Sequence, residues 1–219
     1  MSAFGSWSPP TTQAALLRSD WLVFLWTGLA VAALVYGLIF FTILKWRKRD
    51  EVLPRQFRRN NRLEIFYTIV PLVMVAVLFG VTYAVERPVE AVSAHPDLVV
   101  RVVAYRWGWQ FTYPEQRITL DSNGSSAGPQ LVLPVDRTTR IEITSVDVTH
   151  GFWIPAFLFK RDAIPGLLNR FDLRPNRIGT FSGTCSQFCG LSHALMHFSL
   201  RVVPDAAFTR WADSAASAS

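Results

Sequence analysis

Two long apolar runs dominate the pattern of hydrophobic and polar positions in the first part of the chain. WLVFLWTGLAVAALVYGLIFFTIL covers residues 21–44 without a charge, and IFYTIVPLVMVAVLFGVTYAV covers residues 65–85, also without a charge. A helix needs about 20 apolar residues to cross the hydrocarbon core of a membrane. The pattern therefore predicts two membrane-spanning helices, joined as a helical hairpin through residues 45–64.

The pattern changes from about residue 86 onward. Short runs rich in β-branched and aromatic residues follow one another: DLVVRVVAYRW, TTRIEITSVDV, RIGTFSGT and MHFSLRVV. Turn-forming stretches such as LDSNGSSAGPQ separate them, and only DAAFTRWADS, near the end, suggests a short helix. Strands at this spacing are typical of a β-sandwich or barrel. We expect three parts: a segment at 1–20, the hairpin at 21–85 and an all-β domain at 86–219.

Charge sets the orientation of these parts. Between Lys45 and Arg62 there are eight Lys or Arg residues and two acidic ones. A short basic loop between two spans marks the cytoplasmic side of the membrane, so both the N-terminal segment and the β-domain are expected outside. Of the net charge of +6, the first 85 residues carry +5, with nine basic and four acidic residues. The basic balance therefore indicates membrane topology and contact with lipid, and no nucleic-acid partner is expected.

The N-terminal stretch MSAFGSWSPPTTQAALLRSD has no basic region followed by a short apolar core. It does not resemble a cleaved signal or transit peptide. We expect the first span itself to direct insertion into the membrane.

The soft metal ligands of the chain gather in one stretch, TCSQFCGLSHALMHF, at residues 184–198. A disulfide between Cys185 and Cys189 would close a small loop and stabilise little, and it leaves His193 and Met196 unexplained. Structural zinc favours a CxxC spacing without methionine. Thiolate, thioether and imidazole together select copper. Copper is therefore the favoured interpretation, with a disulfide and zinc as alternatives.

A second histidine has to come from another part of the chain. His95 lies in the linker after the second span, and His197 points away from Met196 if a strand begins there. His150, in SVDVTHGFWIP, ends an alternating strand pattern and precedes a proline-containing turn. That position suits a ligand on a neighbouring loop. Because two cysteines can bridge two metal ions, the cluster together with His150 is compatible with a binuclear site.

The chain resembles subunit II of cytochrome c oxidase, the CuA-bearing subunit of heme-copper oxidases. CSQFCGLSHALM resembles the family pattern C-S-E-x-C-G-x-x-H-x-x-M, and SVDVTHGFWIP resembles S-x-D-V-x-H-x-F/W-x-x-P. KRDAIPGLLN, YRWGWQFTY and EIFYTIVP resemble three further motifs of the family. The five motifs span nearly the whole chain.

The resemblance implies a cupredoxin-like Greek-key barrel as the external domain and a CuA centre of two copper ions. Its ligands would be the side chains of His150, Cys185, Cys189, His193 and Met196 and the backbone carbonyl of Gln187. At position 187 the family usually has glutamate, whose side chain also reaches a magnesium ion shared with the catalytic subunit. Gln187 keeps the carbonyl and lacks the charge, so the magnesium contact is left open.

The implied function is that of the electron-receiving subunit of a terminal cytochrome c oxidase, an oxidoreductase. Electrons from cytochrome c, or a similar small donor, would be accepted at Trp107, although either Trp of YRWGWQF could instead belong to the barrel core. They would pass through CuA to the heme of catalytic subunit I, which holds the heme and CuB. There oxygen would be reduced to water with proton translocation. Subunit III is a further implied partner.

Glu64, just before the second span, matches a family glutamate at the entrance of a proton channel in the catalytic subunit; alternatively it is a surface carboxylate. The implied location is a bacterial inner membrane with the β-domain periplasmic, or the inner membrane of a mitochondrion. Two other functions stay open: the CuA subunit of a nitric oxide reductase, and a membrane-tethered copper chaperone. The chaperone class typically has one anchor helix and a Pro after its C-x3-C motif, where this chain has two spans and Gly190.

Overall fold

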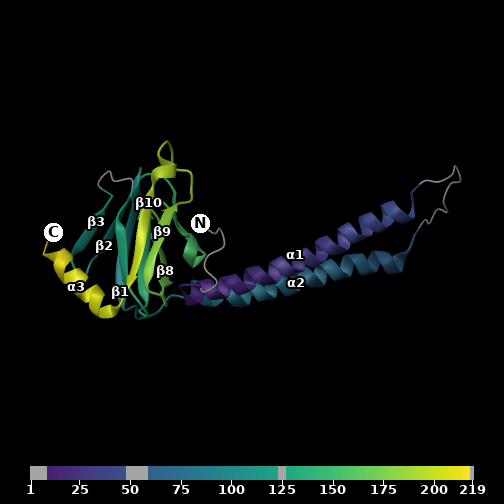
Figure 1. Ribbon diagram of the computed structural model, residues 1–219, viewed down its shortest axis with the longest axis horizontal. Helices are drawn as coiled ribbons and strands as arrows, with labels where there is room; N and C mark the ends of the chain where they lie inside the picture. The colour runs from purple at the N-terminus through teal and green to yellow at the C-terminus, as the bar shows by residue number, and fades with distance from the viewer. Residues whose placement is uncertain (1–8, 48–58, 123–126, 218–219) are drawn as a thin grey trace. The chain divides into compact units, whose positions relative to one another are not determined.

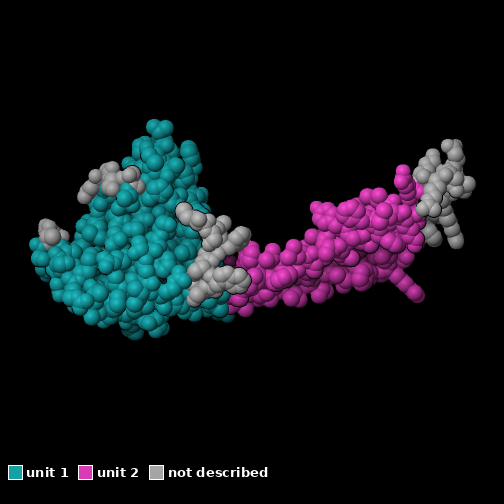
Figure 2. Space-filling model, viewed as in Figure 1, with its two compact units in different colours: residues 1–17, 87–219 teal, residues 18–86 magenta. Residues whose placement is uncertain are grey.

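The computed structural model describes residues 9–47, 59–122 and 127–217. The predicted segment 1–20, the basic loop at 45–64 and the LDSNGSSAGPQ loop lie partly outside these ranges. The chain forms two compact units (Figure 2): residues 18–86, and residues 1–17 together with 87–219. Residues 18–86, magenta in Figure 2, contain most of both long helices, and the teal unit contains the β-domain.

Two helices, α1 (Thr12–Lys45) and α2 (Asn61–Glu90), contain the two apolar runs. Both are longer than the predicted spans. The Thr11 hydroxyl accepts a hydrogen bond from the Ala14 amide at 2.9 Å, and the Asn60 side chain accepts one from the Leu63 amide at 3.3 Å. Such N-caps determine where a helix begins. The apolar run marks only the stretch that suits a membrane, so polar caps extend each helix beyond it.

Both helices are long and apolar enough to cross a membrane, judged by length and composition. Large apolar side chains on them are exposed, among them Trp26, Leu34 and Phe79. Within their unit α1 and α2 run side by side in opposite directions (Figure 1), and the Thr82 hydroxyl donates to the Asp20 carboxylate at 3.4 Å. Exposure of apolar residues all around a helix is the pattern of a membrane span.

The external domain is rich in β-strands, as the sequence predicts, and its described residues form two five-stranded sheets. The first has the order β3-β2-β1-β5-β8 and the second the order β4-β10-β9-β6-β7. The strands of the first sheet are β1 (Leu98–Tyr105), β2 (Gly108–Tyr113), β3 (Ile118–Asp121), β5 (Thr139–Ser145) and β8 (Asn169–Leu173). Those of the second are β4 (Gln130–Pro134), β6 (His150–Ile154), β7 (Phe159–Ala163), β9 (Gly179–Cys185) and β10 (His197–Val203). The predicted C-terminal helix is α3 (Asp205–Ala216).

The register of the second sheet brings distant parts of the sequence together. Strand β6 pairs with β9 so that Phe152 lies opposite Cys185, and β9 pairs with β10 so that Thr184 lies opposite His197. The 3-10 helix η2 (His193–Leu195) sits in the β9–β10 connection, and η1 (Pro155–Phe157) follows β6. The connection between β9 and β10 therefore begins at Cys185, beside β6, and ends at His197, beside Thr184 of β9.

An aromatic core beneath this connection supports it. Trp109, Phe152 and Phe198 are almost fully buried. The rings of Phe152 and Phe198 stack at 4.5 Å, and Trp109 packs edge-on against both. These residues come from both sheets, so the sheets are held together directly under the predicted ligands.

We expect Phe198→Ala to lower the free energy of unfolding of the metal-free chain by about 3–5 kcal/mol, because it removes a buried ring and leaves a cavity. Denaturant unfolding in detergent, followed by tryptophan fluorescence, measures this. Ile178→Ala removes an exposed apolar side chain and serves as the control, with an expected change within about 0.5 kcal/mol. Equal losses in the two variants would contradict the role of this core.

Candidate metal centre

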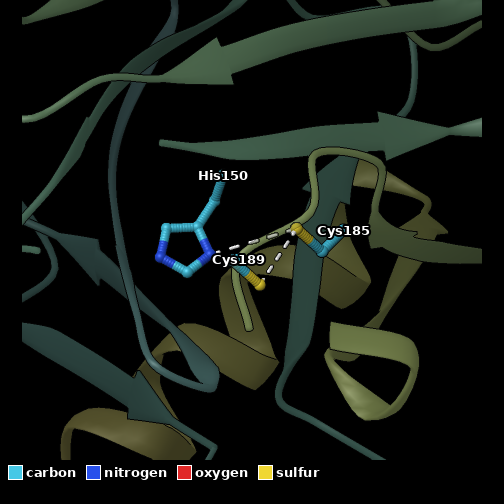
Figure 3. Close-up of side chains that lie close together, drawn as sticks. All are labelled: His150, Cys185 and Cys189. Carbon is cyan, nitrogen blue, oxygen red and sulfur yellow. Dashed lines mark hydrogen bonds between the residues drawn. The ribbon is translucent and has the colours of Figure 1, made fainter. Parts of the chain in front are cut away.

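The six predicted ligands lie at one end of the second sheet. His150 is the first residue of β6 and Cys185 is the last residue of β9. Gln187, Cys189, His193 and Met196 belong to the connection between β9 and β10. Because β6 pairs with β9, the imidazole of His150 faces the two cysteine sulfurs (Figure 3).

The donor atoms form two linked groups. The Sγ atoms of Cys185 and Cys189 are 3.9 Å apart, and Cys185 Sγ lies 3.9 Å from His150 Nδ1 and 3.2 Å from the Gln187 carbonyl oxygen. Cys189 Sγ lies 3.6 Å from His193 Nδ1 and 3.9 Å from Met196 Sδ. Each thiol thus has its own imidazole, and the two thiols face each other. All six predicted residues are brought together.

The cysteines are free, and their sulfurs are far beyond the roughly 2.05 Å of a disulfide bond. The donor atoms of His150, Cys185 and Cys189 lie within 4.8 Å of one another. These three residues and Met196 are buried, with at most 5% of the surface of each residue exposed to solvent. Two thiols, two imidazoles, a thioether and a carbonyl in one cluster fit copper, which prefers soft donors. His95 and His197 are exposed and lie outside this group.

Asp147 fixes the orientation of His150. Its Oδ1 lies 2.9 Å from His150 Nε2, which leaves Nδ1 facing Cys185. The same carboxylate accepts hydrogen bonds from the backbone amides of Val148 at 2.6 Å and Arg106 at 2.7 Å. A carboxylate behind a metal-ligating histidine holds both its tautomer and its ring orientation.

Burial and hydrogen bonding act in opposite directions on these groups. Burial raises the pKa of Asp147, but the hydrogen bonds from His150, Val148 and Arg106 outweigh it and hold that pKa well below its usual range. Burial lowers the pKa of His150, yet hydrogen bonds with Cys185 and Asp147 raise it overall. The Asp147 carboxylate is therefore charged at neutral pH, and its charge polarises the imidazole of His150.

The two thiols have opposite shifts. Burial raises the pKa of Cys185, but its hydrogen bonds with His150 and with the Gly151 backbone lower it overall. Burial raises the pKa of Cys189, and the neighbouring charge of Cys185 raises it further. One sulfur is thus prepared as a thiolate, and the second loses its proton only when a cation compensates the charge.

Trp107 and Trp109 have different environments, which answers a question that the sequence left open. Trp109 is fully buried in the core, while 39% of Trp107 is exposed. The indole Nε1 of Trp107 donates to the Cys189 carbonyl at 3.2 Å. Gly190 has a φ of +119°, and a Cβ there would lie 3.2 Å from the Trp107 ring. A glycine at 190 therefore allows an exposed indole to rest directly on the ligand loop.

Two contacts of the site were not anticipated from the sequence. The Gln187 side-chain amide donates to the Asp162 carboxylate at 3.3 Å, and Arg106 binds Asp147. Asp162 belongs to the KRDAIPGLLN motif, but a spacing of 25 residues gives no sign of its partner. Glu64 lies in the first turn of α2, in the other unit, where its carbonyl accepts a hydrogen bond from the Thr68 hydroxyl at 2.8 Å.

Comparison with known proteins agrees with this geometry. Residues 98–203 match the family model described as cytochrome C oxidase subunit II, periplasmic domain. The chain is 35% identical to a probable cytochrome c oxidase subunit 2 of Streptomyces avermitilis, over 90% of this chain and 74% of that protein. It is 30% identical to cytochrome c oxidase subunit 2 of Cereibacter sphaeroides, over 95% of this chain and 78% of that protein.

A solved structure gives the same result for the β-domain. The periplasmic domain of subunit II of the Bradyrhizobium japonicum cytochrome oxidase superposes with a TM-score of 0.52 at 34% identity, covering 57% of this chain and 96% of that one. Fold and site together define a membrane-anchored protein with an external cupredoxin-like domain of the CuA type. The chain belongs to the cytochrome c oxidase subunit II family and is therefore part of an oxidoreductase complex.

In the metal-free chain we expect one thiolate to form at a pH below the ordinary thiol pKa of about 8.5, because Cys185 is stabilised in its charged form. Thiolate absorbance, recorded as the pH is raised, measures this. His150→Ala removes the main hydrogen bond to the Cys185 sulfur and should move the transition to higher pH. Two thiols that titrate together in the ordinary range would contradict the asymmetry.

Proposed function

We propose that this chain relays single electrons through a binuclear copper centre of the CuA type. The observation that carries the proposal is the pair of buried thiols 3.9 Å apart, each with its own histidine. Two thiols that face each other in this way can bridge two metal ions. The bound copper would supply a one-electron redox couple shared between the two ions.

The surrounding residues suit a relay better than a site where a substrate binds. Protein groups provide all six donors, and His150 and Met196 are almost completely buried. A catalytic metal site keeps a position open for substrate, whereas a closed site keeps its geometry as the charge changes. The core of Trp109, Phe152 and Phe198 beneath the ligands adds rigidity.

Trp107 is the proposed electron-receiving residue. Its ring is partly exposed, and its indole nitrogen reaches the carbonyl of Cys189, a proposed ligand. A donor that touches this ring is therefore connected to the centre through one hydrogen bond and the bonds of Cys189. We propose cytochrome c, or a similar small redox protein, as that donor.

The proposed acceptor is the heme of catalytic subunit I, whose heme and CuB reduce oxygen to water while protons are translocated. Subunit III and membrane lipid complete the proposed surroundings, in a bacterial inner membrane with the β-domain in the periplasm. Glu64 is proposed as an entrance for protons on the cytoplasmic side. Association of the chain with a nitric oxide reductase would place the same copper relay in another complex, which purification of the partners distinguishes.

Electron paramagnetic resonance of the copper-loaded protein tests the relay. One electron shared by two equivalent copper nuclei should give about seven hyperfine lines, against about four for one copper ion. Cys185→Ser removes one bridging sulfur and should abolish the shared signal. A four-line spectrum, or binding of one copper ion per chain, would rule out the relay and favour a chaperone.

Trp107→Phe should slow reduction of the copper centre by the donor about tenfold or more, because a large interface side chain and its hydrogen bond to Cys189 are lost. Stopped-flow absorbance measures the rate. Trp153→Phe is the matched control, since 38% of Trp153 is exposed on β6 and it has no hydrogen bond to the ligand loop. The copper spectrum should stay unchanged in both variants. Equal rates in the two would contradict the role of Trp107.

A further inference from the structure

Gln187 connects the ligand loop to a neighbouring strand. Its backbone carbonyl oxygen lies 3.2 Å from Cys185 Sγ, and its side-chain Nε2 donates to Asp162 Oδ2 at 3.3 Å. Asp162 is on β7, where it lies opposite Gly151 of β6. One residue therefore places a candidate carbonyl ligand and at the same time attaches the loop to the strand beside His150.

The Asp162 carboxylate depends on this contact. Its Oδ1 is buried and has no hydrogen-bond partner among the described residues. Lys160 Nζ is 3.8 Å from Oδ1, which is the distance of an ion pair without a hydrogen bond. The Gln187 amide thus donates to the other carboxylate oxygen, Oδ2, and is its side-chain donor among the described residues. A partly buried carboxylate that loses its donor is strongly destabilised.

The pair does not fit the magnesium ion that family resemblance implies at this position. Magnesium takes oxygen ligands in a near-octahedral arrangement, and carboxylates bind it best. Here the nitrogen of Gln187 faces the carboxylate of Asp162, and an amide N–H group is a donor and not a metal ligand. In the described part of the chain, the position of the loop is already fixed by a direct amide–carboxylate hydrogen bond.

We propose that Gln187 is a positioning residue, which holds the copper-ligand loop on β7 through Asp162 and replaces a divalent cation in that role. This inference rests on the proposed copper relay. It assigns Gln187 two separate functions, one for its carbonyl and one for its amide. The carbonyl is present with any residue at position 187, whereas the amide is not, so substitutions of the side chain isolate the second function.

The test compares wild type, Q187E and Q187E/D162N in the complete oxidase complex. In Q187E two carboxylates face each other, and we expect copper release to a chelator about tenfold faster, with a shifted reduction potential. Q187E/D162N exchanges donor and acceptor and restores the hydrogen bond. It should return the release rate, the potential and the copper spectrum close to those of wild type.

Q110E is the matched control, because Gln110 Nε2 donates to Asp121 Oδ2 at 3.2 Å between β2 and β3, strands of the first sheet that carry none of the six candidate ligands. It should leave the potential and the copper release unchanged. Unchanged release and potential in Q187E, or no rescue in Q187E/D162N, would overturn the proposal.

Electron paramagnetic resonance of protein produced with added manganese tests directly whether a divalent cation binds between Gln187 and Asp162. A manganese ion held by wild type and lost in D162N would show that a cation connects the pair and would also overturn the proposal. The expected result is that neither protein holds manganese at this position. If wild type lacks the shared-copper spectrum, the relay itself fails. If wild type has this spectrum and Q187E matches wild type in copper release and potential, only the role of Gln187 fails.

Discussion

The antiparallel pairing of β6 with β9 is the constraint on which the site depends. It places Phe152 opposite Cys185 and so brings the start of β6 beside the end of β9. His150 and Cys185 are 35 residues apart in the sequence, and this register alone brings them within reach of one metal. The aromatic core under the two strands resists a shift in register, because Phe152 would leave its stack with Phe198.

Hydrogen bonds within the β-domain hold charged side chains in place around that constraint. Asp147 is bonded to His150 on one side and to the Arg106 amide on the other, so its charge serves both the ligand and the turn that carries Trp107. Asp121 is likewise engaged, by Tyr105 and Gln110. These two carboxylates therefore contribute to internal structure.

Much of this organisation could be predicted from the sequence. The two uncharged runs predicted the helices, and the clustered Cys, His and Met residues predicted a soft metal site. The ends of the helices were not predictable from hydropathy, because caps such as Thr11 lie outside the apolar runs. Partners of the ligands were harder still: Asp162 and Gln187 meet only because β7 pairs with β6, and no periodicity in the sequence encodes that approach. The different surroundings of Trp107 and Trp109 arise because Trp107 lies in the turn between β1 and β2, whereas Trp109 is the second residue of β2.

Gly151, the residue after His150, shows that the site also depends on a residue that supplies no ligand atom. A Cβ at this position would collide with the Ser186 hydroxyl and come within 3.0 Å of the Gln187 amide nitrogen. The backbone of β6 and the backbone of the ligand loop are thus in contact, with no side chain between them. A chain with alanine here would keep all six donor groups and still have to move the loop that holds four of them. A substitution at Gly151, which supplies no donor group, therefore disturbs the loop that carries four of the six candidate ligands.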